Sequence, residues 1–181
     1  MVSSGWARPT SGNRTSGFGP RSSQCGNGYC STSYHYGVDL SGGCSAGIYA
    51  AAAGTVVYAG YNGGYGNYIK IDHGDGIGTG YAHIRNGGFN VGYGQRVNAG
   101  DLIGSEGNTG NAFGCNLHFE AYVNGSPLGS LLPDPSRVTD APVATSWSGP
   151  AFAVGDWFGG TLTLISTGTA ALSASPTFTN R

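Results

Sequence analysis

The sequence predicts an all-β fold, mainly an antiparallel sheet with long loops between its strands. Short apolar runs rich in Val, Ile and Tyr are separated by segments that hold many of the chain's 35 glycines, a pattern typical of strands and tight turns. In residues 114–123, apolar and polar side chains alternate, which predicts a strand with one buried face. The chain shows no convincing amphipathic helical pattern.

The expected elements follow from these local patterns. Residues 1–34 are rich in Ser, Gly and Asn and predict loop with one short strand. The turn at 61–66 contains an Asn-Gly pair typical of β-hairpins. Glycine-rich loops are expected at 86–101 and 105–114. The expected strands, in chain order, are residues 17–19, 54–60, 67–73, 79–84, 102–104 and 114–123.

The composition excludes several classes of protein. Charged residues make up 9% of the 181 residues and the net charge is -1, whereas an average soluble domain has roughly 25% charged residues. Such a chain has no excess of positive charge with which to capture nucleic acid or an anionic membrane. No apolar run approaches the roughly 20 residues of a membrane span. We therefore expect neither nucleic acid nor a membrane as a partner.

The character of the chain changes after Pro133-Asp134-Pro135. Residues 137–181 contain two of the three tryptophans and a Thr/Ser-rich run, but no histidine. We therefore predict a main domain over residues 1–136 and a strand-rich C-terminal extension over residues 137–181. The sequence assigns no chemistry to this extension.

The cysteines indicate an oxidising compartment. Four cysteines allow three pairings, and we expect disulfides Cys25–Cys30 and Cys44–Cys115, with free buried thiols as the alternative. Residues 1–6 lack a basic segment followed by an apolar stretch, so we expect no signal peptide. A mature chain with an added Met, an excised domain and export by another route remain open.

Three residues have the chemistry of a metal site. The strand at 114–123 places His118 and Glu120 on its polar face. His35 and Asp39 are four residues apart in a segment that contains Gly37, and an even spacing in extended backbone keeps both on one face. Two imidazoles and one carboxylate, with a fourth position left for water, form a catalytic zinc arrangement.

Each of these residues also has a structural interpretation. A lone histidine on a strand is more often a structural residue than a ligand. His73 is most simply a turn-capping residue, because Gly74-Asp75-Gly76 follows it. His83 fits either a buried core position or a functional one. Glu120 fits either a partner that fixes the tautomer of His118 or a structural carboxylate.

Blocks of sequence over residues 6–133 resemble the lysostaphin-type zinc endopeptidases, also called β-lytic metallopeptidases, which cut peptidoglycan cross-bridges or stem peptides. The blocks that carry the resemblance are Phe18-Gly19-Pro20-Arg21, His35-Tyr36-Gly37-Val38-Asp39, Ile48-Tyr49-Ala50-Ala51, Gly54-Thr55-Val56-Val57, Tyr68-Ile69-Lys70-Ile71-Asp72-His73-Gly74, Tyr81-Ala82-His83-Ile84, Val97-Asn98-Ala99-Gly100-Asp101-Leu102-Ile103-Gly104 and Leu117-His118-Phe119-Glu120. Cysteines matching Cys44 and Cys115 can occur together in this family.

The resemblance implies a site and a fold. It makes His35, Asp39 and His118 the ligands of one zinc ion, and His83 a catalytic histidine beside the metal-bound water. It makes His73 structural. The implied fold is a small antiparallel sheet whose long loops wall a substrate groove, with the zinc at its floor.

Asn116 departs from the family pattern, which has a second catalytic histidine at this position. An asparagine can donate or accept a hydrogen bond, but it cannot take up a proton near neutral pH. Two functions follow from this difference. The first is a zinc endopeptidase acting on peptidoglycan peptide, assisted by His83. The alternative is a catalytically impaired member that serves as a cell-wall-binding or phage-particle module.

The resemblance also implies a location. A peptidoglycan hydrolase works outside the cytoplasm, so we expect an extracellular or cell-wall location. The chain would be secreted or delivered by a phage, with other wall or phage-particle components as further partners.

Overall fold

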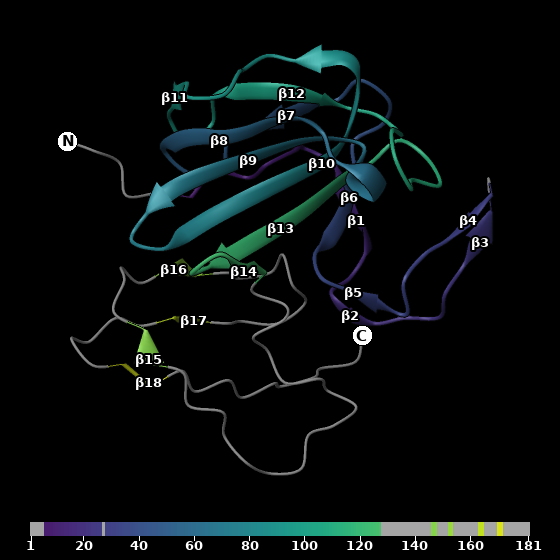
Figure 1. The fold of residues 1–181 in the computed structure, drawn as a ribbon, viewed down its shortest axis with the longest axis horizontal. Helices are drawn as coiled ribbons and strands as arrows, with labels where there is room; N and C mark the ends of the chain where they lie inside the picture. The colour runs from purple at the N-terminus through teal and green to yellow at the C-terminus, as the bar shows by residue number, and fades with distance from the viewer. Residues whose placement is uncertain are drawn as a thin grey trace.

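A computed structural model describes residues 6–26 and 28–127, together with the backbone of four two-residue strands further along the chain (Figure 1). Among the described residues, ten strands form one antiparallel sheet, which confirms the predicted fold class. Its main path, in spatial order, is β1 (Asn13–Ser16), β6 (Val38–Ser41), β13 (Leu117–Val123), β10 (Ile77–Phe89), β9 (Asn67–Gly74), β8 (Gly54–Tyr61) and β11 (Arg96–Val97).

Three further strands extend this sheet at its sides. β12 (Leu102–Glu106) pairs with β10 and with β7 (Gly47–Tyr49), and β14 (Ser126–Pro127) pairs with β13. The short elements outside the sheet are the pairs β2 (Gly19–Pro20) with β5 (Tyr34–His35), β3 (Cys25–Gly26) with β4 (Tyr29–Cys30), β15 (Ser146–Trp147) with β18 (Ala170–Ala171) and β16 (Phe152–Ala153) with β17 (Thr163–Leu164), and the 3-10 helix η1 (Gly63–Tyr65). In the part of the chain that is described, no helix has the length and hydropathy needed to cross a bilayer.

The hydrophobic core lies against one face of the central strands. Leu117 and Phe119 of β13 are buried in it together with Val38 of β6 and Ile69 of β9. The opposite face of β13 carries His118 and the polar residues beside it. The predicted alternation of apolar and polar side chains is confirmed, and it separates the core from the site. The expected strand begins later, at Leu117, and both of its faces are buried, not one.

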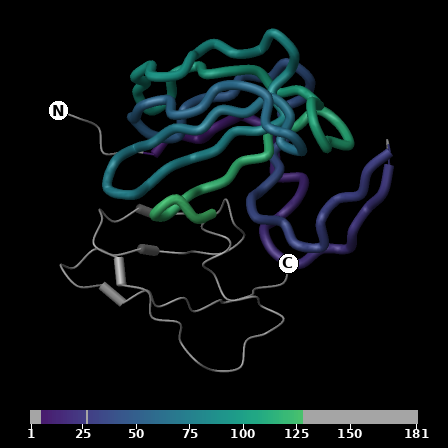
Figure 2. The backbone as a smooth tube through the Cα atoms, in the orientation of Figure 1, coloured from purple at the N-terminus to yellow at the C-terminus, as the bar shows by residue number. Residues whose placement is uncertain are grey.

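Strand β10 changes partner along its length. Residues 77–82 pair with β13, whereas Ile84 and Phe89 pair with β12. Between these two halves lies His83, which has a positive φ of 64°. The two strands that share this edge of β10 therefore diverge at one residue. Figure 2 shows the same backbone as a tube.

Two loop predictions were wrong in part. The expected loop at 86–101 begins later, because β10 runs to Phe89. A Cβ at Gly104 would lie 3.1 Å from the Gly88 carbonyl oxygen, so these glycines permit the close approach of β10 and β12. The amino-terminal 34 residues contain several short strands, not one. The expected hairpin turn at 61–66 is confirmed, because it joins antiparallel strands β8 and β9, and it holds the 3-10 helix η1.

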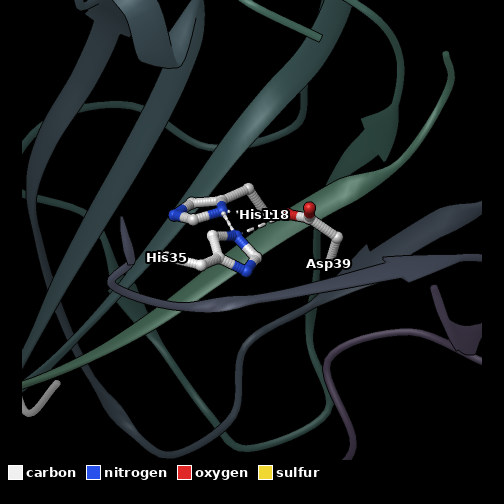
Figure 3. Close-up of side chains that lie close together, drawn as sticks. All are labelled: His35, Asp39 and His118. Carbon is white, nitrogen blue, oxygen red and sulfur yellow. Dashed lines mark hydrogen bonds and ion pairs between the residues drawn. The ribbon is translucent and has the colours of Figure 1, made fainter. Parts of the chain in front are cut away.

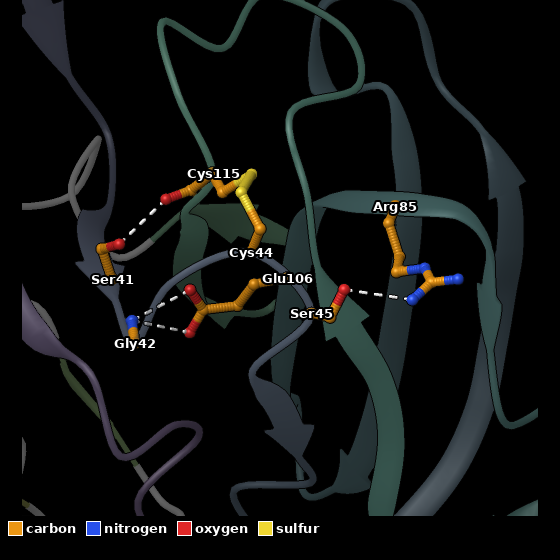
Figure 4. The surroundings of a disulfide bond; sticks show 7 residues. All are labelled: Ser41, Gly42, Cys44, Ser45, Arg85, Glu106 and Cys115. Atoms are coloured by element: carbon orange, nitrogen blue, oxygen red, sulfur yellow. Dashed lines mark hydrogen bonds between the residues drawn. A yellow bond between two sulfur atoms is a disulfide. The ribbon is translucent and has the colours of Figure 1, made fainter.

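Two disulfides have the predicted pairing. Cys25–Cys30 closes the β3–β4 hairpin, which extends away from the sheet (Figure 1). Cys44–Cys115 joins the loop after β6 to the segment before β13, across 71 residues of sequence. Nearby, the carboxylate of Glu106 accepts a hydrogen bond from the Gly42 backbone N–H (Figure 4). It also accepts one from the Thr10 hydroxyl, which fixes the amino-terminal segment beside the same loop.

The predicted division at residue 136 lies outside the described residues and stays a prediction. The same holds for the extension over residues 137–181, of which the structure describes only the backbone of the four short strands β15–β18.

The two disulfides should differ in their contribution to stability. Replacing Cys44 and Cys115 together with serine should lower the free energy of unfolding by about 4 kcal/mol, because the released loop is long. The matched Cys25→Ser/Cys30→Ser variant opens a loop of sequence separation 5 and should lose about 2 kcal/mol. Denaturant unfolding of both variants measures the difference. Equal losses, or a larger loss for the short hairpin, would contradict this assignment.

Candidate metal centre

His35, Asp39 and His118 converge on one point (Figure 3). His35 Nε2 lies 2.9 Å from His118 Nδ1 and 3.1 Å from Asp39 Oδ1, and His118 Nδ1 lies 2.9 Å from the same oxygen. His35 is buried and His118 is 8% exposed. The structure thus brings together the three residues that the sequence predicted as metal ligands.

Strand pairing explains how distant residues meet. Asp39 of β6 lies directly opposite His118 of β13 in the antiparallel register. His35 reaches the same point from β5 because Gly37 lets the intervening segment pass close to β13. A Cβ at Gly37 would lie 2.4 Å from the Phe119 carbonyl oxygen, so a side chain there would push this segment away from the site.

Hydrogen bonds outside the cluster determine which ring nitrogens face it. His35 Nδ1 lies 2.7 Å from the Gly17 carbonyl oxygen, which can only accept, so Nδ1 carries the proton and Nε2 faces the cluster. His118 Nε2 lies 2.8 Å from Glu120 Oε1 and Nδ1 lies 2.9 Å from Asp39 Oδ1, so Nδ1 is the ring nitrogen that faces the cluster. Two ring nitrogens and a carboxylate oxygen therefore point at one another.

This donor set fits a cation. Unprotonated nitrogens less than 3 Å apart repel each other and the carboxylate unless a proton or a metal ion lies between them. Two histidines and one aspartate are ligands that zinc accepts, and three protein ligands leave a position for water. The residues present therefore fit the zinc ion that the resemblance implies.

The ionisation of the cluster is consistent with this fit. Burial raises the pKa of Asp39, but hydrogen bonds from His118 and His35 more than offset burial and hold the pKa of the carboxyl well below its usual range. Burial lowers the pKa of His118, but its hydrogen bonds to Asp39 and Glu120 outweigh burial and raise that pKa to about 9. In the metal-free chain, a proton on His118 occupies the place that a metal would take.

Arg21 contacts the outer oxygen of the aspartate. Its Nη1 lies 3.7 Å from Asp39 Oδ2, while Oδ1 faces the histidines. The guanidinium also donates from Nε to the Thr32 carbonyl oxygen. Arg21 therefore helps to orient the carboxylate so that one oxygen is directed into the cluster.

His83 lies beside the cluster without joining it. Its ring centroid is 5.9 Å from that of His118, and its Nδ1 donates to the Thr109 carbonyl oxygen, which leaves Nε2 as the basic nitrogen. Burial lowers the pKa of His83 to about 4, so the ring is neutral at neutral pH. Its positive φ costs roughly 1–3 kcal/mol, and such strain concentrates at functional sites.

Asn116 precedes β13 on the polar side of the strand. Its backbone N–H donates to the Gly107 carbonyl oxygen. Its Oδ1 is buried and has no hydrogen-bond partner among the residues that the structure describes. A buried acceptor of this kind is rare in folded proteins.

His73 is structural, as the resemblance implies, but the turn-capping interpretation was wrong. Its Nδ1 bonds the Ala53 carbonyl oxygen and its Nε2 bonds the Thr79 hydroxyl, so the ring joins neighbouring strands. Asp72 caps the turn instead, by accepting a hydrogen bond from the Gly74 backbone N–H.

Sequence reasoning missed two residues of the site. Tyr65 and Tyr122 both donate to the Glu120 carboxylate. Tyr122 follows Glu120 by two residues in an alternating strand, so the pattern could have placed it on the polar face. Nothing in the sequence spacing indicates Tyr65, which comes from the turn before β9.

An all-β domain with two histidines and an aspartate converging on one face of a sheet defines a candidate metallopeptidase. Residues 33–130 match Peptidase family M23, and because this match covers more than half of the chain, the chain belongs to that family. The fold agrees with the catalytic domain of the antimicrobial peptidase lysostaphin from Staphylococcus simulans. The two structures have a TM-score of 0.57 and 34% sequence identity, over 69% of this chain and 90% of that domain.

Two curated relatives are similar over the same region. DD-carboxypeptidase/endopeptidase Mpg of Neisseria meningitidis serogroup B is 38% identical over 104 residues, which are 56% of this chain and 24% of the relative. Peptidoglycan DD-endopeptidase ShyA of Vibrio cholerae is 35% identical over 97 residues, which are 54% of this chain and 22% of the relative. The chain thus matches about a quarter of the length of these relatives.

Removing one ligand of the cluster should abolish metal binding. We expect His118→Ala to lose stoichiometric zinc, because only two of the three converging side chains remain. His73→Ala removes a histidine outside the cluster and should retain one zinc ion per chain. Metal content after gel filtration, with circular dichroism to check folding, measures both. A folded His118→Ala variant that still holds one zinc ion would refute the ligand assignment.

Proposed function

We propose that this chain is a zinc-dependent endopeptidase that hydrolyses peptide bonds of bacterial peptidoglycan, in a cross-bridge or a stem peptide. The convergence of His35, Asp39 and His118 on one point is the observation that carries the proposal. Membership of Peptidase family M23 and the similarity to a peptidoglycan DD-endopeptidase support the substrate class.

His35 Nε2, Asp39 Oδ1 and His118 Nδ1 would hold the zinc ion. When bound, zinc supplies Lewis acidity, which lowers the pKa of a water molecule to about 7 and polarises the scissile carbonyl. The buried positions of the two histidines hold their rings in place for this role. Arg21 keeps the Asp39 carboxylate turned toward the histidines.

His83 is the base and acid of the proposed reaction. Its Nε2 accepts a proton from the attacking water and returns it to the leaving amine. Because burial lowers the pKa of His83 to about 4, the ring is neutral at neutral pH and the lone pair of Nε2 is free. The hydrogen bond from Nδ1 to Thr109 fixes the orientation of the ring.

Asn116 orients a bound molecule without exchanging protons. An asparagine amide can donate or accept a hydrogen bond, but it cannot take up a proton near neutral pH. Under this proposal one proton-transferring histidine suffices for catalysis. The alternative is a member that binds the wall or a phage particle without cutting.

The two disulfides support a location outside the cytoplasm, because disulfides persist in oxidising compartments. We therefore propose an extracellular or cell-wall location, reached by secretion or by phage delivery. Any role of residues 137–181 in contacting other wall or phage-particle components stays a prediction.

Replacing His83 should separate catalysis from metal binding. We expect His83→Ala to retain one zinc ion per chain and to lose about 10²–10⁴-fold in the rate of peptidoglycan hydrolysis, the contribution typical of one acid–base group. Turbidity loss of purified cell walls and zinc content measure the two properties. Unchanged lysis by the zinc-loaded variant would remove His83 from the mechanism.

Asn116→His discriminates between the enzyme and the impaired member. If the native chain holds zinc and lyses purified walls, the substitution should change the rate by less than tenfold, because His83 already supplies acid–base catalysis. A native chain that binds zinc and walls without releasing peptide fragments, and gains lysis on this substitution, would establish the alternative.

A further inference from the structure

Glu120 is the centre of a buried hydrogen-bond network next to the metal centre. Its side chain is 1% exposed. Oε1 accepts hydrogen bonds from His118 Nε2 at 2.8 Å and from the Tyr65 hydroxyl at 2.9 Å, and Oε2 accepts one from the Tyr122 hydroxyl at 2.5 Å. A buried carboxylate is costly unless its oxygens are paired, and three donors satisfy this one.

A second layer of contacts holds the network in place. The Tyr122 hydroxyl gives its proton to Glu120, so it accepts from the Tyr68 hydroxyl, 3.0 Å away. Tyr68 reaches this position only because Gly80 has no side chain. A Cβ at Gly80 would lie 2.2 Å from the Tyr68 hydroxyl oxygen. Gly80 pairs directly with Glu120 across the sheet, so the space is created at the network itself.

Tyr65 reaches Glu120 from a separate element. It ends the 3-10 helix η1 in the turn before β9, and its ring lies 5.1 Å from that of Tyr68 and 5.8 Å from that of His118. The network therefore joins the turn, the central strands and the ligand His118. Because these contacts end at His118, they indicate that the network positions that residue.

Two carboxylates compete for the proton of one imidazole. Glu120 Oε1 faces His118 Nε2 at 2.8 Å, and Asp39 Oδ1 faces Nδ1 at 2.9 Å. A neutral ring has a single proton. If that proton stays on Nδ1, it is donated into the cluster and blocks the lone pair that a metal needs. If it stays on Nε2, Nδ1 is free to coordinate.

We propose that Glu120 keeps the proton of neutral His118 on Nε2 and thereby leaves Nδ1 free to coordinate a metal ion. Tyr65, Tyr122 and Tyr68 hold Glu120 in place, and Gly80 provides the space for Tyr68. These are positioning residues that act through His118. This inference rests on the proposed zinc site. Carboxylates that orient a ligating histidine typically contribute 10–100-fold to metal affinity.

The alternative is that the network only stabilises the sheet. Replacing Glu120 with glutamine separates the two roles, because the amide keeps the shape and one acceptor oxygen but not the charge. A neutral acceptor binds a proton donor about half as strongly as a carboxylate. Asp39 keeps its charge and should then retain the proton on Nδ1.

The experiment combines zinc affinity with the position of the proton. Zinc affinity is measured by competition with a chromophoric chelator. The protonated nitrogen of His118 is identified from imidazole ¹⁵N shifts of the metal-free protein, at a pH where the ring has lost one proton. For the native chain we expect protonation of Nε2. For Glu120→Gln we expect protonation of Nδ1 and zinc binding weakened about 10–100-fold.

Two tyrosine variants test the inference without depending on the folding of Glu120→Gln. Tyr65→Phe removes one donor to Oε1 from a partly buried turn position, and should weaken zinc binding less than Glu120→Gln does. Tyr58→Phe is the control. Its hydroxyl donates to the Tyr61 carbonyl oxygen, and phenylalanine keeps the ring that packs against Tyr68, so zinc affinity should not change. If Glu120→Gln fails to fold, the comparison of Tyr65→Phe with Tyr58→Phe decides.

Three results would overturn the inference. Glu120→Gln could bind zinc within twofold of the native chain, or it could keep the proton on Nε2 while zinc binding falls. Equal zinc affinities for Tyr65→Phe and Tyr58→Phe would also count against it. A native chain that binds no zinc would refute the proposed function instead, and the ¹⁵N shifts of the metal-free proteins would still decide the placement of the proton.

Discussion

The register between β6 and β13 is the constraint on which the site depends. His118 lies opposite Asp39, and the flanking pairs Leu117 with Leu40 and Phe119 with Val38 belong to the core. Because side chains alternate with period two, a slip of one residue would turn His118 into the core and expose Phe119. The same apolar contacts that stabilise the sheet therefore fix the relative position of two metal ligands.

Two features outside the cluster protect this register. Gly37 allows the chain to pass close to β13 and return His35 to the same point. Cys44–Cys115 joins the segments that leave β6 and enter β13, so the ends of the paired strands are held together covalently. On the other edge, β10 leaves β13 at His83, where the backbone has a positive φ. The strained residue is thus located where the sheet divides, next to the ligands.

Features that depend on residues close together in the sequence could be predicted from the sequence. The alternation around His118 indicated the central strand and its polar face. The spacing of His35 and Asp39, together with the ordered motifs of the resemblance, indicated the three converging residues. The extension of β10 to Phe89 was missed because a glycine such as Gly88 is compatible both with a loop and with a close backbone contact between strands. Tyr65 was missed because it meets Glu120 only through the fold, from 55 residues away. Contacts between residues so far apart produce no periodic pattern in the sequence.

Stability alone does not explain why this chain, which has few charged residues, places two carboxylates at the site. Asp39 and Glu120 are two of only nine acidic residues, and both contact the same buried imidazole. Replacing buried ionic groups by apolar residues of similar volume is often neutral or stabilising. A fold selected for stability alone would therefore have little reason to keep a carboxylate on each side of His118. The arrangement is explained if Glu120 accepts the hydrogen bond from Nε2 of His118 and Nδ1 is left to bind a cation beside Asp39. The disulfide beside the two ligand strands offsets part of the cost of holding these groups in place.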